Sequence, residues 1–97
     1  MRYAIILAPE AIEDLRRLKA GHRTAVKAAL EVHLRNEPSK ASRSRIKRLR
    51  GLSRPQYRLR IGNFRVFYDV ADGGVEVLAI IPKMETSAWL KQFGKPQ

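Results

Sequence analysis

Two short turns organise the region between residues 56 and 81, and they constrain the fold more than any other feature of the chain. Gly62-Asn63 separates an alternating segment over 56–61 from one over 64–70, and Asp72-Gly73 separates the second segment from another over 75–81. Such glycine-containing pairs favour two-residue turns between antiparallel strands. The sequence therefore predicts a meander of three antiparallel strands.

These turns also predict which residues share a face of the sheet, because side chains alternate along a strand. If each turn holds two residues, Arg60 pairs with Arg65. The apolar face, which is expected to pack on helices, then carries Leu59, Ile61, Phe64, Val66, Tyr68, Val70, Val75, Val77, Ala79 and Ile81. The opposite face carries Arg58, Arg60, Arg65, Phe67, Glu76, Leu78 and Ile80. The arginines are therefore expected to lie outside the core.

The segments before the meander are typical of one strand and two helices. Residues 2–8 are apolar and β-branched, and Pro9 suits the first turn of a helix whose apolar residues repeat at three- and four-residue spacing as far as Leu18. Gly21 is expected to cap that helix, and a second amphipathic helix is expected over 22–36. Two helices joined in this way form a helical hairpin.

The remaining segments complete the predicted topology. Residues 39–44 are polar and suit a connecting loop, residues 48–52 suit a short strand or lead-in, and residues 85–93 have apolar residues at helical spacing. The chain is therefore expected to form a single α+β domain over 1–97, with the order β-α-α-β-β-β and a short C-terminal helix. We expect an antiparallel sheet covered on one face by the helical hairpin.

The charge of the chain is concentrated in one stretch. The 97 residues have a net charge of +11, yet residues 38–68 contain ten basic residues and no Asp or Glu, so nearly all of the excess lies there. A one-signed field of this size attracts polyanions, of which nucleic acid or an acidic protein is the default partner. The sequence has no cysteine and no apolar run long enough to cross a bilayer, and its first residues do not resemble a signal peptide. We therefore expect a cytoplasmic protein without a membrane role.

Two interpretations of Arg58, Arg60 and Arg65 are open at this point. Exposed sheet faces often carry charged side chains, so the arginines could simply pair with Asp69, Glu76 or Glu85. Like charges placed opposite each other are destabilising, however, unless an anion lies between them. The acid-free stretch around the cluster favours an anion site on a rigid sheet.

The ordered set of segments resembles the RelE/ParE family of bacterial type II toxins, over nearly the whole chain. The resemblance rests on the element order, Leu49-Arg50-Gly51 before the sheet, Tyr57-Arg58-Leu59-Arg60, the strand Phe64-Arg65-Val66-Phe67-Tyr68, and Val77-Leu78-Ala79-Ile80. It implies a growth-arresting toxin that a cognate acidic antitoxin neutralises. In the RelE branch the toxin cleaves messenger RNA on the ribosome and so inhibits translation; in the ParE branch it inhibits DNA gyrase.

The RelE-like branch, which we favour, implies an endoribonuclease that needs no metal and no cofactor. The 2′-hydroxyl of the RNA attacks the adjacent phosphate, and the protein orients the chain and stabilises the added negative charge. On this pattern Arg58 and Arg60 match two basic positions of the family's second sheet strand, and Arg65 matches the residue that holds the scissile phosphate. Phosphate contacts with RNA are expected from four neighbouring basic residues, Lys47, Arg48, Arg50 and Arg54.

The chain departs from the RelE pattern after its last strand. That pattern has a basic pair followed by a catalytic tyrosine, whereas this chain has Lys83-Met84 and, near the place of the tyrosine, Leu90 beside Trp89. Lys83 can supply one charge and is the candidate for proton transfer. Trp89 could stack on a base, but its helical spacing with Leu90 and Phe93 favours packing in the core.

The departure keeps a second class of function open. The alternative is a non-cleaving protein, either a ParE-like gyrase inhibitor or a catalytically weakened binder of an acidic antitoxin. In either class an antitoxin is expected to lay an acidic, partly apolar segment over the arginines and the helical hairpin. Any DNA operator would be bound only through the antitoxin complex.

Overall fold

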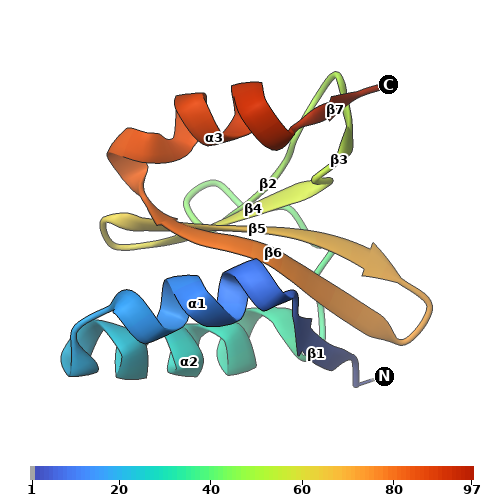
Figure 1. The fold of residues 1–97 in the computed structure, drawn as a ribbon. Coiled ribbons are helices and arrows are strands. Elements are labelled where there is room, and N and C mark those ends of the chain that lie inside the picture. The colour runs from blue at the N-terminus through green and yellow to red at the C-terminus, as the bar shows by residue number, and fades with distance from the viewer. Residues whose placement is uncertain (1) are drawn as a thin grey trace.

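The structure is a computed structural model that describes residues 2–97, and it places helices on both faces of a central sheet (Figure 1). In chain order the elements are β1 (Ala4–Leu7), α1 (Pro9–Arg17), α2 (Ala20–Leu34), β2 (Ile46–Arg48), β3 (Leu52–Arg54), β4 (Tyr57–Ile61), β5 (Phe64–Ala71), β6 (Gly74–Pro82), the 3-10 turn η1 (Lys83–Glu85), α3 (Thr86–Phe93) and β7 (Lys95–Pro96). The predicted α+β class is confirmed, and the predicted helices and meander strands occur in the predicted order. Strands β3 and β7 were not predicted, and residues 49–51 of the strand or lead-in predicted over 48–52 lie between β2 and β3 instead.

The main sheet has five strands in the order β1-β6-β5-β4-β2. Both hairpins have the predicted two-residue turns, because Ile61 pairs with Phe64 and Ala71 with Gly74. The prediction of an antiparallel sheet was incomplete, since β1 runs parallel to β6 and makes the sheet mixed. No turn joins β1 to β6, so the local sequence signals that set the hairpin registers are missing for this pair.

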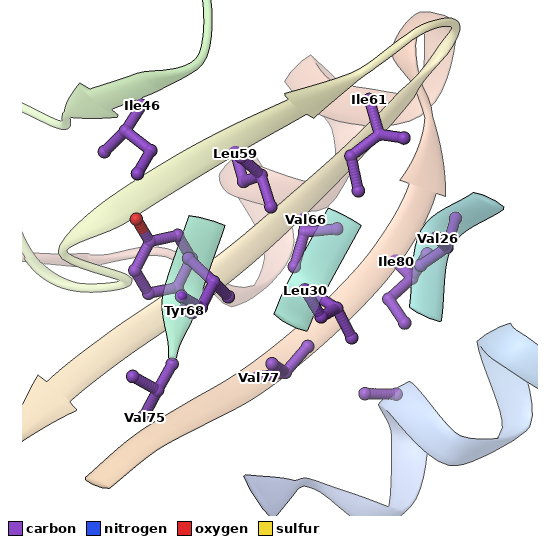
Figure 2. Close-up of a cluster of buried hydrophobic side chains, with 12 residues drawn as sticks. Val26, Leu30, Ile46, Leu59, Ile61, Val66, Tyr68, Val75, Val77 and Ile80 are labelled. Carbon is purple, nitrogen blue, oxygen red and sulfur yellow. The ribbon is translucent and has the colours of Figure 1, made fainter. Parts of the chain in front are cut away.

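The main hydrophobic core lies between the sheet and the helical hairpin (Figure 2). Leu59, Val66 and Tyr68 point from β4 and β5 towards the apolar stripe of α2, formed by Val26, Leu30 and Leu34, as predicted. Tyr68 is completely buried, and its hydroxyl donates a hydrogen bond of 2.7 Å to the Pro38 carbonyl oxygen. A buried hydroxyl needs such a partner, so this bond also ties the loop after α2 to the core.

The predicted face assignment fails in the second half of β6. Phe67 pairs with Ala79 while Tyr68 pairs with Val77, so Leu78 is an extra residue in the ladder. This β-bulge reverses the alternation beyond it. Ile80 therefore packs in the core under the helices, and Ala79 and Ile81, predicted there, lie on the opposite face.

The connection between the two helices is shorter than predicted. Helix α1 ends at Arg17, and the N–H of Leu18 donates to the Leu15 carbonyl oxygen. Helix α2 begins at Ala20, so Gly21 lies inside its first turn and does not cap α1. The two residues between the helices suffice because Arg23 donates hydrogen bonds to the carbonyl oxygens at the end of α1, including 2.9 Å to Leu18.

The free strand edges are closed by side chains and loops. Where β1 stops, the Asp14 carboxylate accepts the N–H of Ile80 at 3.0 Å, and Pro82 has no N–H to offer. On β2, Ser42 accepts the N–H of Ile46 with its hydroxyl and donates its own N–H to the Ile46 carbonyl oxygen. Such contacts remove the unpaired groups that would otherwise template pairing with another strand.

The C-terminal helix α3 covers part of the face opposite the hairpin. Trp89 stacks on Phe67 with ring centroids 5.0 Å apart, and Leu90 packs with them in a second, smaller core. Strand β7 pairs with β3, which fastens the end of α3 to the main body. The prediction that Trp89 packs in a core is confirmed. None of the helices described in residues 2–97 is long and apolar enough to span a bilayer.

Candidate anion site

The β4–β5 hairpin brings the three predicted arginines onto one face of the sheet. Arg60 pairs directly with Arg65, and Arg58 pairs with Phe67 one step further along the ladder. Because paired residues of an antiparallel ladder point the same way, Arg58, Arg60 and Arg65 project from the face opposite the main core. We call these three residues the arginine cluster.

Arg65 is buried, contrary to the prediction that the cluster would lie outside the core. Its relative exposure is 7%, and its Nη1 donates hydrogen bonds of 2.9 and 2.8 Å to the carbonyl oxygens of Gly62 and Phe64. Ile81 lies beside it on β6 as a consequence of the bulge at Leu78. The side chain is therefore held in place by the hairpin turn and by its neighbours in the sheet.

Arg58 is half-buried and Arg60 is exposed. The Nε of Arg58 is shielded from solvent and has no hydrogen-bond partner among the described residues. Burial, together with the charges of Arg65 and Arg60, lowers the pKa of Arg58, and burial with the charge of Arg60 lowers the pKa of Arg65. Guanidinium groups remain protonated at neutral pH, so the cluster holds three mutually repelling cations.

The acids in residues 2–97, Glu85 among them, form no ion pair with the cluster. Of the acids predicted as alternative partners, Asp69 and Glu76 form ion pairs with Arg54, at 3.5 and 3.2 Å. Within residues 2–97 none of the ion pairs includes a member of the arginine cluster. The structure therefore favours the interpretation of the cluster as an anion site over that of a solvated face of paired charges.

The four residues predicted to contact RNA phosphates are separated by the fold. Lys47 pairs with Arg58 across β2 and β4, so it projects beside the cluster. Arg48 points to the other face, where its guanidinium lies 5.2 Å from the centre of the Tyr57 ring. Arg54 forms ion pairs with Asp69 and Glu76, and Arg50 is exposed in the turn after β2. Of these four residues, Lys47 is the one that projects beside the cluster.

Lys83 lies at the end of the sheet that carries Arg60 and Arg65. Its backbone N–H donates a hydrogen bond of 2.8 Å to the carbonyl oxygen of Asn63, in the turn of the β4–β5 hairpin. Its side chain is exposed and belongs to η1, between β6 and α3. Lys83 therefore stands at the rim of the arginine cluster.

An aromatic stack borders the cluster on the side of α3. Phe67, next to Arg58 in the ladder, stacks on Trp89, and Trp89 contacts Phe93 at 5.5 Å between ring centroids. One face of Trp89 is thus taken by Phe67. Leu90, near the place where the RelE pattern has its tyrosine, packs in the same small core.

One basic residue near the cluster was missed by the sequence analysis. Arg45 accepts the N–H of Arg60 with its carbonyl oxygen, and its Nη1 lies 3.4 Å from the carbonyl oxygen of Arg60. Arg45 falls between the predicted loop over 39–44 and the predicted strand or lead-in over 48–52, so it belonged to neither segment. Its alternation with Lys47 was the available signal.

The described residues offer no set of three or more His, Cys, Asp or Glu side chains close enough to hold a metal ion. The three guanidinium groups and Lys47, on strands β2, β4 and β5, can bind negative charge and stabilise it electrostatically.

Comparison with solved structures identifies the class to which this fold belongs. RelE of Pyrococcus horikoshii, determined in complex with RelB, superimposes with a TM-score of 0.70 at 24% identity, covering 86% of this chain and 97% of that one. RelBE2 of Mycobacterium tuberculosis gives 0.70 at 24% identity over 84% and 92%. A mutant of Escherichia coli RelE in the free state gives 0.68 at 26% identity over 94% and 93%.

The family itself follows from the sequence. A family model described as the ParE toxin of the type II toxin-antitoxin system parDE matches residues 5–86. The chain therefore belongs to the ParE toxin family of type II toxin-antitoxin systems, and its fold is that of the RelE toxins. No curated protein sequence matches the chain.

Proposed function

We propose that this toxin is a metal-independent endoribonuclease that cleaves messenger RNA on the ribosome and thereby inhibits translation in the cytoplasm. The observation that carries the proposal is the arginine cluster, in which three cations without acidic partners are held on a rigid hairpin beside Lys47. A surface of this kind matches the charge of a phosphodiester and of the transition state for its cleavage.

In the proposed reaction the 2′-oxygen of the RNA forms a bond to the adjacent phosphorus, and the bond from phosphorus to the 5′-oxygen of the next nucleotide breaks. The products are a cyclic phosphate and a 5′-hydroxyl, so one proton must leave the 2′-hydroxyl and one must reach the 5′-oxygen. Arg65 would hold the scissile phosphate, and Arg58 and Arg60 would stabilise the charge added to its oxygens. Lys83 is the candidate for one of the proton transfers.

RNA binding outside the cluster is assigned to fewer residues than the sequence suggested. Lys47 projects beside Arg58 and Arg50 is exposed in the next turn, so both can contact phosphates. Arg48 and Arg54 are assigned structural roles instead, because one stacks on Tyr57 and the other pairs with Asp69 and Glu76.

The proposed partner for neutralisation is an acidic antitoxin that covers the arginine cluster. The RelE proteins of Pyrococcus horikoshii and Methanococcus jannaschii were both determined with RelB antitoxins. Because the cluster lacks internal acids, carboxylates from a partner would relieve its repulsion. We expect the affinity of the complex to fall with added salt, and an affinity that does not change with salt would contradict this proposal. Operator DNA would be bound only through that complex.

Inhibition of DNA gyrase without RNA cleavage is the second candidate. It is favoured by the match to the ParE family model and by Leu90, which packs in the small core near the place where the RelE pattern has its tyrosine. In this case the basic surface would serve the antitoxin or gyrase.

Induction of the toxin in growing cells, followed by primer extension on translated messages, separates the two candidates. Cleavage predicts cuts with codon periodicity that weaken by ~10²-fold or more in Arg60→Gln, which removes one cation from an exposed position. Lys27→Gln removes an equal charge from an exposed position on α2, and this variant should cleave messages like the wild type. Intact messages accompanied by gyrase-dependent DNA breaks would instead establish the second candidate.

A further inference from the structure

The arginine cluster is an unfavourable arrangement in the absence of an anion. Arg60 faces Arg65 directly, Arg65 is 7% exposed, and the shielded Nε of Arg58 lacks a partner in the described chain. Like charges on paired positions are destabilising, and a shielded donor without an acceptor loses its hydration without recompense. The repulsion between the guanidinium groups is relieved when an oxyanion binds beside them.

The fold maintains this arrangement by keeping its own acids away. Arg54 forms ion pairs with Asp69 and Glu76, the two carboxylates that occupy the same face of β5 and β6. Both hydrogen bonds of the Arg65 guanidinium leave from Nη1 and run to backbone carbonyls, so they neutralise none of its charge. The pKa values of Arg58 and Arg65 are lowered by burial and by the neighbouring positive charges, which agrees with a cluster whose charges are not neutralised.

We propose that the arginine cluster and Lys47 bind a free multivalent phosphate oxyanion, of the inorganic pyrophosphate class, in the toxin alone, and that the bound anion stabilises the fold. The toxin without RNA or antitoxin is then a protein whose stability depends on small anions. This inference rests on the proposed role of the cluster as a phosphate site, but it requires no cleavage and no ribosome.

A multivalent phosphate fits the cluster better than a halide does. The planar guanidinium groups present paired donors that match the spacing of phosphate oxygens, and the exposed side chains of Arg60 and Lys47 are accessible to an anion from solvent. Lys47 adds a fourth positive charge from β2. Chloride would screen these charges but would not satisfy the donors in a fixed geometry.

Thermal unfolding in sodium pyrophosphate and in sodium chloride of equal ionic strength tests the inference on the purified toxin. We expect the Tm to rise saturably with pyrophosphate, by ~5–10 °C at ten times the Kd that calorimetry measures, and to rise much less with chloride. Equal rises in the two salts would overturn the inference, because they would show general screening alone.

Two variants and a matched control locate the effect. Arg60→Gln and Lys47→Gln remove one exposed cation each from the site and should at least halve the pyrophosphate shift, while their Tm without pyrophosphate is equal to or above that of the wild type. Lys27→Gln makes the same change of net charge on the far face of the sheet and should retain the full shift. A shift that is the same in all three proteins would overturn the proposed location.

The outcome is distinguishable from that of the proposed function. A specific pyrophosphate shift in a toxin that leaves messages intact would support the anion site and remove the nuclease. Message cleavage by a toxin that responds equally to pyrophosphate and chloride would remove the free-anion site and leave the nuclease standing.

Discussion

The two faces of the sheet use the same strands but satisfy their side chains in different ways. On the face under α1 and α2, apolar residues pack on one another, and the polar group that is buried there, the Tyr68 hydroxyl, has a hydrogen-bond partner. On the face partly covered by α3, a small aromatic core borders three arginines that have no acidic partner in the described chain. On the first face the buried side chains are satisfied within the chain, whereas the second carries like charges that the acids of residues 2–97 do not pair.

This difference shows where stability and binding are separated in a chain of 97 residues. A small domain has little apolar surface to bury. A charged second face is therefore compatible with a folded protein only if the first face supplies most of the folding free energy. Neighbouring residues on β4 illustrate the division, because Leu59 is completely buried and Arg60 is exposed.

Separate substitutions of Leu59 and Arg60 test the difference between the two faces. Leu59→Ala should lower the free energy of unfolding by about 2–5 kcal/mol, because it removes a side chain from the centre of the main core and leaves a cavity. Arg60→Gln should change it by less than about 0.5 kcal/mol, or raise it. Urea denaturation measures both, and losses of similar size would contradict the division between the faces.

The hydrogen bond between the Asp14 carboxylate and the Ile80 N–H, at the unpaired edge of β6, gives the next largest expected effect. Asp14→Ala leaves the N–H of Ile80 without an acceptor at the bulge, which should cost about 1–3 kcal/mol. Asp14→Asn keeps an acceptor oxygen and is the matched control, with a smaller loss. If chemical denaturation shows equal stability for Asp14→Ala and the wild type, water satisfies this N–H and the carboxylate does not stabilise the edge of β6.

The hydrogen bond of Tyr68 gives a smaller effect with a pH signature. Tyr68→Phe removes the donor to the Pro38 carbonyl oxygen and should cost about 1–2 kcal/mol, whereas Tyr57→Phe serves as the control. Burial raises the pKa of Tyr68 above its ordinary value of 10.0, so the folded protein keeps the hydroxyl protonated where the unfolded chain loses it. Stability should therefore fall as the pH rises above 10.0.

That alkaline loss should be reduced in Tyr68→Phe and retained in Tyr57→Phe, as followed by denaturation between neutral pH and pH values above the ordinary tyrosine pKa. Parallel pH profiles for the two variants would show that Tyr68 is not the group responsible.

The smallest expected effect is on the acid side. Burial, followed by the charge of Arg45, lowers the pKa of His33 below its ordinary value of 6.5. The unfolded chain then binds the proton at a higher pH than the folded protein does, so stability is fully present above 6.5 and falls gradually as the pH drops below it. Thermal melts of the wild type and His33→Gln over this range should diverge slightly, and superimposable profiles would contradict the assignment.

Most of the fold was predictable because its main signals are local. Gly62-Asn63 and Asp72-Gly73 set the two hairpins, and the pairing of Arg60 with Arg65 follows from the length of the first turn alone. The bulge at Leu78 could not be predicted, because an inserted residue on an apolar strand leaves the composition of both faces unchanged. The parallel pairing of β1 with β6 has no connecting turn, so nothing in the local sequence announces it.

For the site, the sequence likewise predicted the features that depend on local alternation and not those that depend on packing. The alternation on β4 and β5 predicted that Arg58, Arg60 and Arg65 share a face, and the structure confirms it. Their surroundings depended on segments distant in sequence. The acids that might have paired with the cluster are held by Arg54, and Arg65 is buried.

The sequence by itself therefore determined the helices, the three strands of the meander and the face on which the arginines lie, because turn chemistry and side-chain alternation act over a few residues. Only the tertiary structure decided that Lys47 joins the cluster, that Arg48 and Arg54 do not, and that Arg58 keeps a shielded donor without a partner. These facts depend on which strands become neighbours and which side chains meet across them. Burial and charge pairing are properties of that packing, and no short segment contains them.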